Sequence, residues 1–90
     1  MRVLITPTFS DVRSGIEARS PLLELAGHGY DRASATDSLA RGVRAWCVGL
    51  EARGELEKGL RDRGIRWDPS GIELVIEILN GRDESESTPY

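Results

Sequence analysis

The side chains that most often carry catalysis or bind metals are few in this 90-residue chain. The single histidine, His28, lies between two glycines, and the single cysteine, Cys47, follows much later. A metal site needs several histidines, cysteines or carboxylates at ligand spacing, which these two residues do not provide. A catalytic histidine needs an orienting acid and a nucleophile. Asp31 is close to His28, but no serine or cysteine motif accompanies the pair. We therefore predict no catalytic residue, no metal site and no cofactor.

Acidic side chains raise a second possibility, because paired carboxylates bind Mg²⁺ in metal-dependent nucleases. The candidates are scattered over predicted strands and a helix start: Asp11, Glu17, Asp37 and Glu73. Scattered acids of this kind are typical of a solvated sheet face, so a small metal-dependent nuclease is the less favoured alternative. The chain has no GxxxxGK phosphate loop, and residues 27–29 lack the rest of a dinucleotide fingerprint.

The charge balance argues against direct nucleic-acid binding. The chain has 12 basic and 15 acidic residues, for a net charge of −3, whereas nucleic-acid binders usually carry a basic excess. Six arginines could form a basic strip: Arg41, Arg44, Arg53, Arg61, Arg63 and Arg66. Acidic residues are interspersed among them, which is typical of an ordinary charged helix surface.

One cysteine allows no disulfide within a monomer. Neither a signal peptide nor an apolar run of about 20 residues is visible. We expect a cytoplasmic protein without a membrane span.

The longest predicted element covers residues 35–64 and reads as a helical hairpin or a bent helix. Its apolar side chains recur at steps of three and four, which places them on one helix face: Leu39, Val43, Trp46, Leu50, Leu56 and Leu60. Ser34 or Thr36 is the expected N-cap. Gly54 is expected to break or bend the helix, and Gly64 is a natural residue after its end. Trp46 and Cys47 are predicted to be packing residues.

Glycines are also expected to mark close packing. Gly42 and Gly49 weaken the helix by roughly 1 kcal/mol each relative to alanine, so we interpret them as places where the helix lies close to a sheet. Residues 27–29 are interpreted as a flexible corner that permits a close backbone approach.

Strands are predicted on both sides of the helix, over residues 2–10, 16–20 and 72–79, with 22–26 as a third strand or an extended loop and a short extended run at 65–67. Pro7 places the first strand at an edge or interrupts it. In the last strand Ile72, Leu74, Ile76 and Ile78 form an apolar face that must be buried. Trp67 is either a core residue or an interface anchor.

These elements predict an α+β fold in the order β-β-β-α-(α)-β, with one antiparallel sheet that carries its helices on one face. Residues 1–79 are expected to form one domain, and 80–90 a disordered acidic tail. Small domains have modest cores and free sheet edges, so a homodimer or higher homo-oligomer is expected.

Three segments in sequence resemble the HicB-like antitoxin family. They are Pro21-Leu22-Leu23-Glu24-Leu25, the glycine-rich Gly27-His28-Gly29, and the helix start at residues 33–40. Ser20 stands where the family often has a cysteine, and Asp37 alone represents its acidic pair. No DNA-binding module follows the last predicted strand. The resemblance implies a truncated, degraded RNase H-like domain without the catalytic acids, which binds a small toxin ribonuclease and blocks it, or an orphan of that family.

Under this reading the chain is a non-enzymatic protein-binding module. We expect its function on the sheet face opposite the helices, on the strand edges and around residues 27–31. The predicted partner-binding residues are Arg19, Pro21, His28, Tyr30 and Trp67. The alternative is a self-associating structural or regulatory domain whose edge strand pairs between copies.

Overall fold

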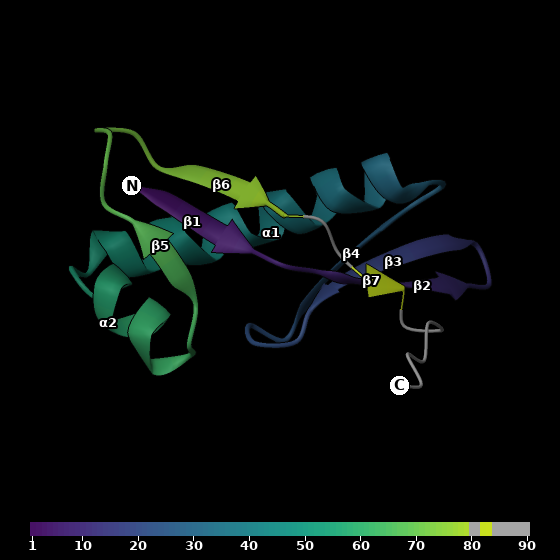
Figure 1. Ribbon diagram of the computed structural model, residues 1–90, viewed down its shortest axis with the longest axis horizontal. Helices are drawn as coiled ribbons and strands as arrows, with labels where there is room; N and C mark the ends of the chain where they lie inside the picture. Colours follow the sequence, from purple (N-terminus) through teal and green to yellow (C-terminus); the bar gives the residue numbers. More distant parts are fainter. Residues whose placement is uncertain (80–81, 84–90) are drawn as a thin grey trace.

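The computed structural model describes residues 1–79 and the backbone of 82–83, and it shows a small α+β fold (Figure 1). Two helices follow four strands, and three further strands follow the helices. In chain order the elements are β1 (Arg2–Ile5), β2 (Thr8–Val12), β3 (Gly15–Ser20), β4 (Leu25–Gly29), α1 (Arg32–Ala52), α2 (Leu56–Asp62), β5 (Arg66–Asp68), β6 (Val75–Ile78) and β7 (Arg82–Asp83). The α+β class is confirmed.

The strands form two sheets, so the expectation of a single antiparallel sheet was wrong. The first sheet has the order β5-β1-β6 and the second β4-β3-β2-β7. Each sheet is mixed, because β6 runs parallel to β1 and β7 runs parallel to β2. The division occurs at Pro7, which is fully buried between β1 and β2. Proline has no backbone N–H to donate to a ladder. The predicted strand 2–10 is therefore interrupted, and its two halves join different sheets.

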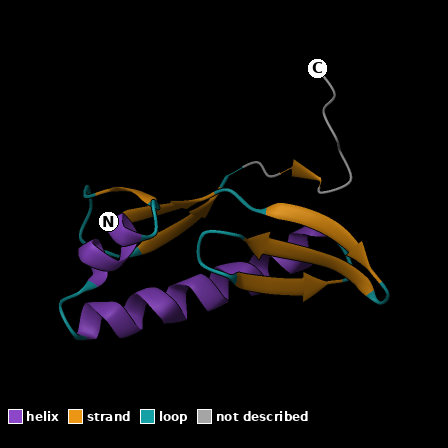
Figure 2. Ribbon diagram, turned by 90° about the horizontal axis from the view of Figure 1, so that it is seen from below, coloured by secondary structure: helices purple, strands orange, loops and turns teal. Residues whose placement is uncertain are grey.

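Helix α1 lies along one side of both sheets and holds them together (Figure 2). It packs against β3 and β4 of one sheet and β6 of the other. Its fully buried residues are Ala35, Leu39, Val43 and Cys47, which meet Val3, Ile5, Phe9 and Ala18 from the strands in one core. Burying a valine or leucine side chain contributes about 1.5–3 kcal/mol, so this stripe is a major source of stability. Trp46 is only partly buried at its margin.

Two glycines of β4 make the closest contact between α1 and a sheet. A Cβ atom on Gly27 would collide with the backbone N of Leu39 and lie 2.6 Å from the O of Ala35. A Cβ on Gly29 would lie 2.5 Å from the N of Ala35. The prediction of a close backbone approach at residues 27–29 is therefore confirmed, but they are strand rather than a corner. The interpretation of Gly42 and Gly49 as contact points was wrong, since a Cβ on either would meet nothing within 4 Å.

The helix boundaries differ from the predicted ones at the start and agree at the break. Asp31, and not Ser34 or Thr36, is the N-cap of α1, and its Oδ1 accepts a hydrogen bond from the Ser34 N–H at 2.8 Å. Gly54, with φ +69°, separates α1 from α2, as predicted. The Asp31 side chain satisfies an N–H that the first helical turn leaves without a partner. The hydrogen bonds from Ser34 hold the pKa of the Asp31 carboxyl below its ordinary value.

The last predicted strand is shorter than expected at its start. Ile72 is fully exposed rather than buried. Gly71 has φ +86°, and the N-terminal ammonium donates hydrogen bonds to the carbonyls of Gly71 and Glu73. These bonds hold residues 71–73 as a loop over the start of β1, so the strand begins only at Val75. Of the predicted tail, 82–83 form the short strand β7, whereas 80–81 and 84–90 lie outside the described residues.

We predict that Gly27→Ala destabilises the fold by at least about 3 kcal/mol, because backbone atoms of α1 cannot rotate away from the added methyl group. The matched control is Gly42→Ala, which meets no neighbour and should stabilise the helix by about 1 kcal/mol. Urea unfolding monitored by circular dichroism measures both free energies. Equal stabilities for the two variants would contradict the contact between Gly27 and α1.

The Asp31 cap should make the stability of the fold depend on pH in the acidic range. Its pKa in the folded chain lies below the ordinary value of 3.8, so the carboxylate stabilises the fold above that pH. The contribution is lost as the pH falls through the folded-state pKa. Asp31→Asn keeps a capping oxygen and cannot titrate, so its melting temperature should fall less between pH 5 and pH 2.5 than that of the unmodified chain. An unchanged pH profile would show that the Asp31 carboxylate does not contribute.

Candidate functional site

The sheet formed by β2, β3 and β4 has one covered face and one open face. Ala18 and Gly27 are paired across β3 and β4 on the face that meets α1. Because side chains alternate between faces along a strand, the intervening residues lie on the opposite side. They form two rows across the three strands: Thr8, Arg19 and Ala26 in one, and Ser10, Glu17 and His28 in the other. This open face is where the sequence led us to expect function.

Glu17 lies at the centre of this face and brings two of the predicted partner-binding residues together. Its Oε2 is 3.1 Å from Nε2 of His28, and its Oε1 accepts a hydrogen bond from Nε of Arg19 at 3.3 Å. The Glu17 side chain is 17% exposed, whereas those of His28 and Arg19 are 61% and 51% exposed. The carboxylate is therefore sheltered, and the face presents an imidazole and a guanidinium fixed by strand pairing. Sequence reasoning had considered Glu17 only as a nuclease acid.

The other predicted partner-binding residues lie at different distances from this cluster. Tyr30 is 93% exposed and lines, with His28 and Val12, a shallow hollow of about 250 Å³ at one end of the face. Pro21 is exposed in the turn after β3. Trp67 is on β5 in the other sheet and packs against the core. The structure thus brings Arg19 and His28 onto one sheet face, with Tyr30 beside His28 in the hollow at its end, and it does not bring Trp67 there.

Of the four carboxylates named for the nuclease alternative, the two on paired strands, Asp11 and Glu17, do not converge. Asp11 pairs with Ile16 across β2 and β3, whereas Glu17 pairs with Ser10. Neighbouring pairs in an antiparallel ladder point to opposite faces, so Asp11 and Glu17 lie on opposite sides of the sheet. Among the residues that the structure describes, no group of three or more histidines, cysteines or acids is placed to hold a metal ion.

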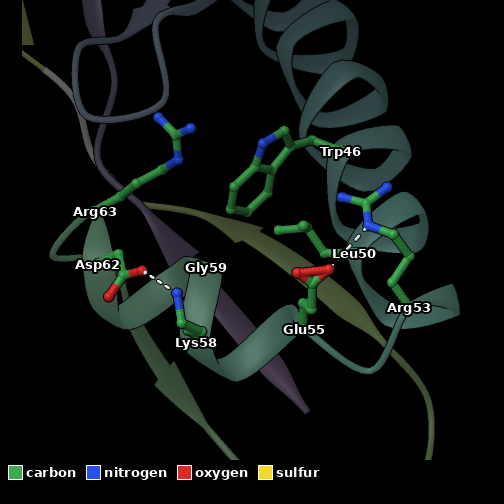
Figure 3. A pocket seen from close by; sticks show the side chains of 8 residues that line it. All are labelled: Trp46, Leu50, Arg53, Glu55, Lys58, Gly59, Asp62 and Arg63. Atoms are coloured by element: carbon green, nitrogen blue, oxygen red, sulfur yellow. Dashed lines mark hydrogen bonds and ion pairs between the residues drawn. The ribbon is translucent and has the colours of Figure 1, made fainter.

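A groove of about 530 Å³ lies between the end of α1 and α2 (Figure 3). Arg63 lies over the Trp46 ring, 5.5 Å from its centroid. Ion pairs within the groove neutralise its other charges: Arg53 with Glu55 at 3.1 Å, and Lys58 with Asp62 at 3.2 Å. Sequence reasoning missed this groove. Gly59 was the available signal, because it has no side chain where α2 approaches Leu50.

Cys47 was weighed as a metal ligand, and its surroundings identify it as a packing residue. It is fully buried in the stripe of α1. Burial raises the pKa of its thiol to about 11, and Glu51 adds to the effect. The reactive thiolate is therefore scarce near neutral pH.

We predict that Cys47 of the folded chain reacts with a thiol reagent at pH 8 at least about two orders of magnitude more slowly than in denaturant, because it is both protonated and covered. The matched reference is the same chain unfolded in guanidinium, which exposes the thiol. Absorbance at the reagent's product wavelength follows both reactions. Similar rates in the two conditions would mean that the thiol is accessible in the fold.

Within residues 1–79, neither helix combines the length and the apolar character that crossing a bilayer requires. Comparisons of the chain with protein-family models, with curated proteins and with solved structures found no match.

Proposed function

We propose that this chain is a non-enzymatic protein-binding module of the HicB-like type, which binds a small toxin ribonuclease and neutralises it. The observation that carries the proposal is the open face of β2, β3 and β4. Arg19 and His28 are exposed there on neighbouring strands, and Tyr30 is exposed directly after β4. Tyrosine and arginine are enriched among the residues that dominate binding energy at protein interfaces. Strands hold such side chains in fixed positions, so little ordering entropy is lost when a partner binds.

The order and packing of the elements support the resemblance. The antiparallel strands β2, β3 and β4 lead directly into α1, and β6 returns parallel to β1. This arrangement is compatible with a β-β-β-α-β unit that carries additional short elements. The glycine segment that contributed to the resemblance also has a physical role, since Gly27 and Gly29 allow α1 to lie directly on β4.

The charge of the chain supports a basic partner. The net charge is −3, and a ribonuclease that binds RNA is expected to be basic. Opposite net charges accelerate association and orient the partners before contact. The charge of Arg19 is opposite in sign to the net charge of the chain, and its Nε donates a hydrogen bond to Glu17. We therefore expect contacts at this face to depend on shape and hydrogen bonding more than on charge.

We predict that a small basic protein is encoded next to this chain, that the two co-purify when co-expressed, and that the chain rescues growth in cells that produce that protein. Tyr30→Ala should weaken the complex by about thirtyfold, as expected for a large aromatic side chain that dominates binding energy at an interface. Arg61→Ala is the matched control, since Arg61 is exposed on α2, away from the open face. Calorimetry on the purified pair measures the affinities. Neither co-purification nor rescue would occur if the proposal is wrong.

A further inference from the structure

Strand β6 forms one edge of its sheet, with β1 on its other side (Figure 1). The N–H of Val75 donates to the carbonyl of Met1 at 2.9 Å, and that of Leu79 donates to Ile5 at 2.7 Å. Successive residues of an extended strand direct their backbone groups to opposite sides. The N–H and C=O groups of Ile76 and Ile78 therefore point away from β1, to an edge that pairs with no strand in the described part of the chain.

This edge has few of the features that usually protect one. Protective features include proline, lysine, a bulge or a covering segment, and the sequence Val-Ile-Glu-Ile of β6 contains neither proline nor lysine. Glu77 is engaged on the outer sheet face, where it forms two hydrogen bonds with Arg2 at 2.6 and 2.7 Å. Just before the strand, the carbonyl of Leu74 accepts a hydrogen bond from Nη2 of Arg44 at 2.9 Å. The remaining edge can template a further strand.

A groove of about 290 Å³ runs between this edge and α1, and its lining indicates which strand would fit. Its lining residues are Asp37, Ala40, Arg41, Arg44 and Ile76. Ala40 and Ile76 supply a small apolar surface. Arg41 is exposed and forms no ion pair within the described residues. Arg44 uses one N–H on Leu74, and a guanidinium has five N–H donors. Two arginines against one acid leave the groove positively charged.

We propose that this groove binds an extended peptide segment that carries carboxylate side chains and adds to β6 as the next strand. The backbone N–H groups of Ile76 and Ile78 donate ladder hydrogen bonds, and their carbonyls accept them. Only another peptide backbone offers the alternating acceptors and donors that pair with both. Arg41 and Arg44 then bind carboxylates on the side of the added strand that faces α1, and Ala40 and Ile76 contact the methylene groups of the same side chains. This is strand addition at a helix-flanked edge, and the arginines select an acidic segment over a basic one.

The test uses the full chain and a short labelled peptide of alternating valine and glutamate. Two companion peptides isolate the two contributions: in one, lysine replaces glutamate; in the other, alternate backbone nitrogens are methylated and cannot donate. Fluorescence anisotropy measures affinity, and amide spectra report which residues change. We expect the acidic peptide to bind and to shift the amide signals of Ile76 and Ile78. The affinity of the lysine peptide and that of the methylated peptide should each be at least about tenfold lower than that of the acidic peptide.

A charge-reversed pair of variants completes the test. Arg41→Glu should weaken binding of the acidic peptide by about tenfold, because a charge-assisted hydrogen bond is lost. Arg13→Glu makes the same charge change on the exposed turn between β2 and β3 and should leave the affinity unchanged. Equal binding of acidic and basic peptides, or equal losses in the two variants, would overturn the proposal. So would protection of the Ile76 and Ile78 amides without peptide at concentrations where light scattering detects a dimer, because a second copy would then occupy the edge.

Discussion

The fold depends on how closely α1 approaches β4. Gly27 and Gly29 offer no side chain on the covered face, so the backbone of α1 near Ala35 and Leu39 lies directly against the strand. That contact fixes the position of the helix N-terminus, which Asp31 caps one residue before α1 begins. The rest of α1 extends from this anchored end across both sheets (Figure 2). A single helix can serve two sheets because its buried stripe, from Ala35 to Cys47, meets strands of both.

Pro7 imposes the second constraint. By removing one ladder donor and filling a buried position, it turns a single N-terminal strand into β1 and β2. The C-terminal strands follow the same path in parallel, β6 beside β1 and β7 beside β2. Two small sheets have more free edges and uncovered faces than one large sheet of the same strands. Since α1 covers only one side, the fold leaves open both the outer face of β2, β3 and β4 and the free edge of β6.

Local periodicity made the helix predictable, and long-range pairing made the sheets unpredictable. The four-residue spacing of Leu39 and Val43 identifies the buried helix face without any knowledge of the sheet against which it packs. The cluster of Glu17 and His28 depends instead on the register of β3 against β4, which the four-residue turn 21–24 sets. The exposure of Ile72 depends on the N-terminal ammonium, which is distant in sequence and donates to Gly71. The alternation from Ile72 to Ile78 fits a strand equally well with or without that contact.

The two proposed binding surfaces, both left open by α1, offer different features to a partner. The face of β2, β3 and β4 offers Arg19 and His28 from paired strands, so under our proposal it would select a folded surface of complementary shape. The edge of β6 offers backbone groups and two arginines, so under our proposal it would select an extended segment whatever fold that segment comes from. They lie on different sheets, and no residue of one contributes to the other. A substitution at Tyr30 should therefore leave binding at the β6 edge unchanged, and a substitution at Arg41 should leave the open face intact, because effects at separate sites without shared partners add independently.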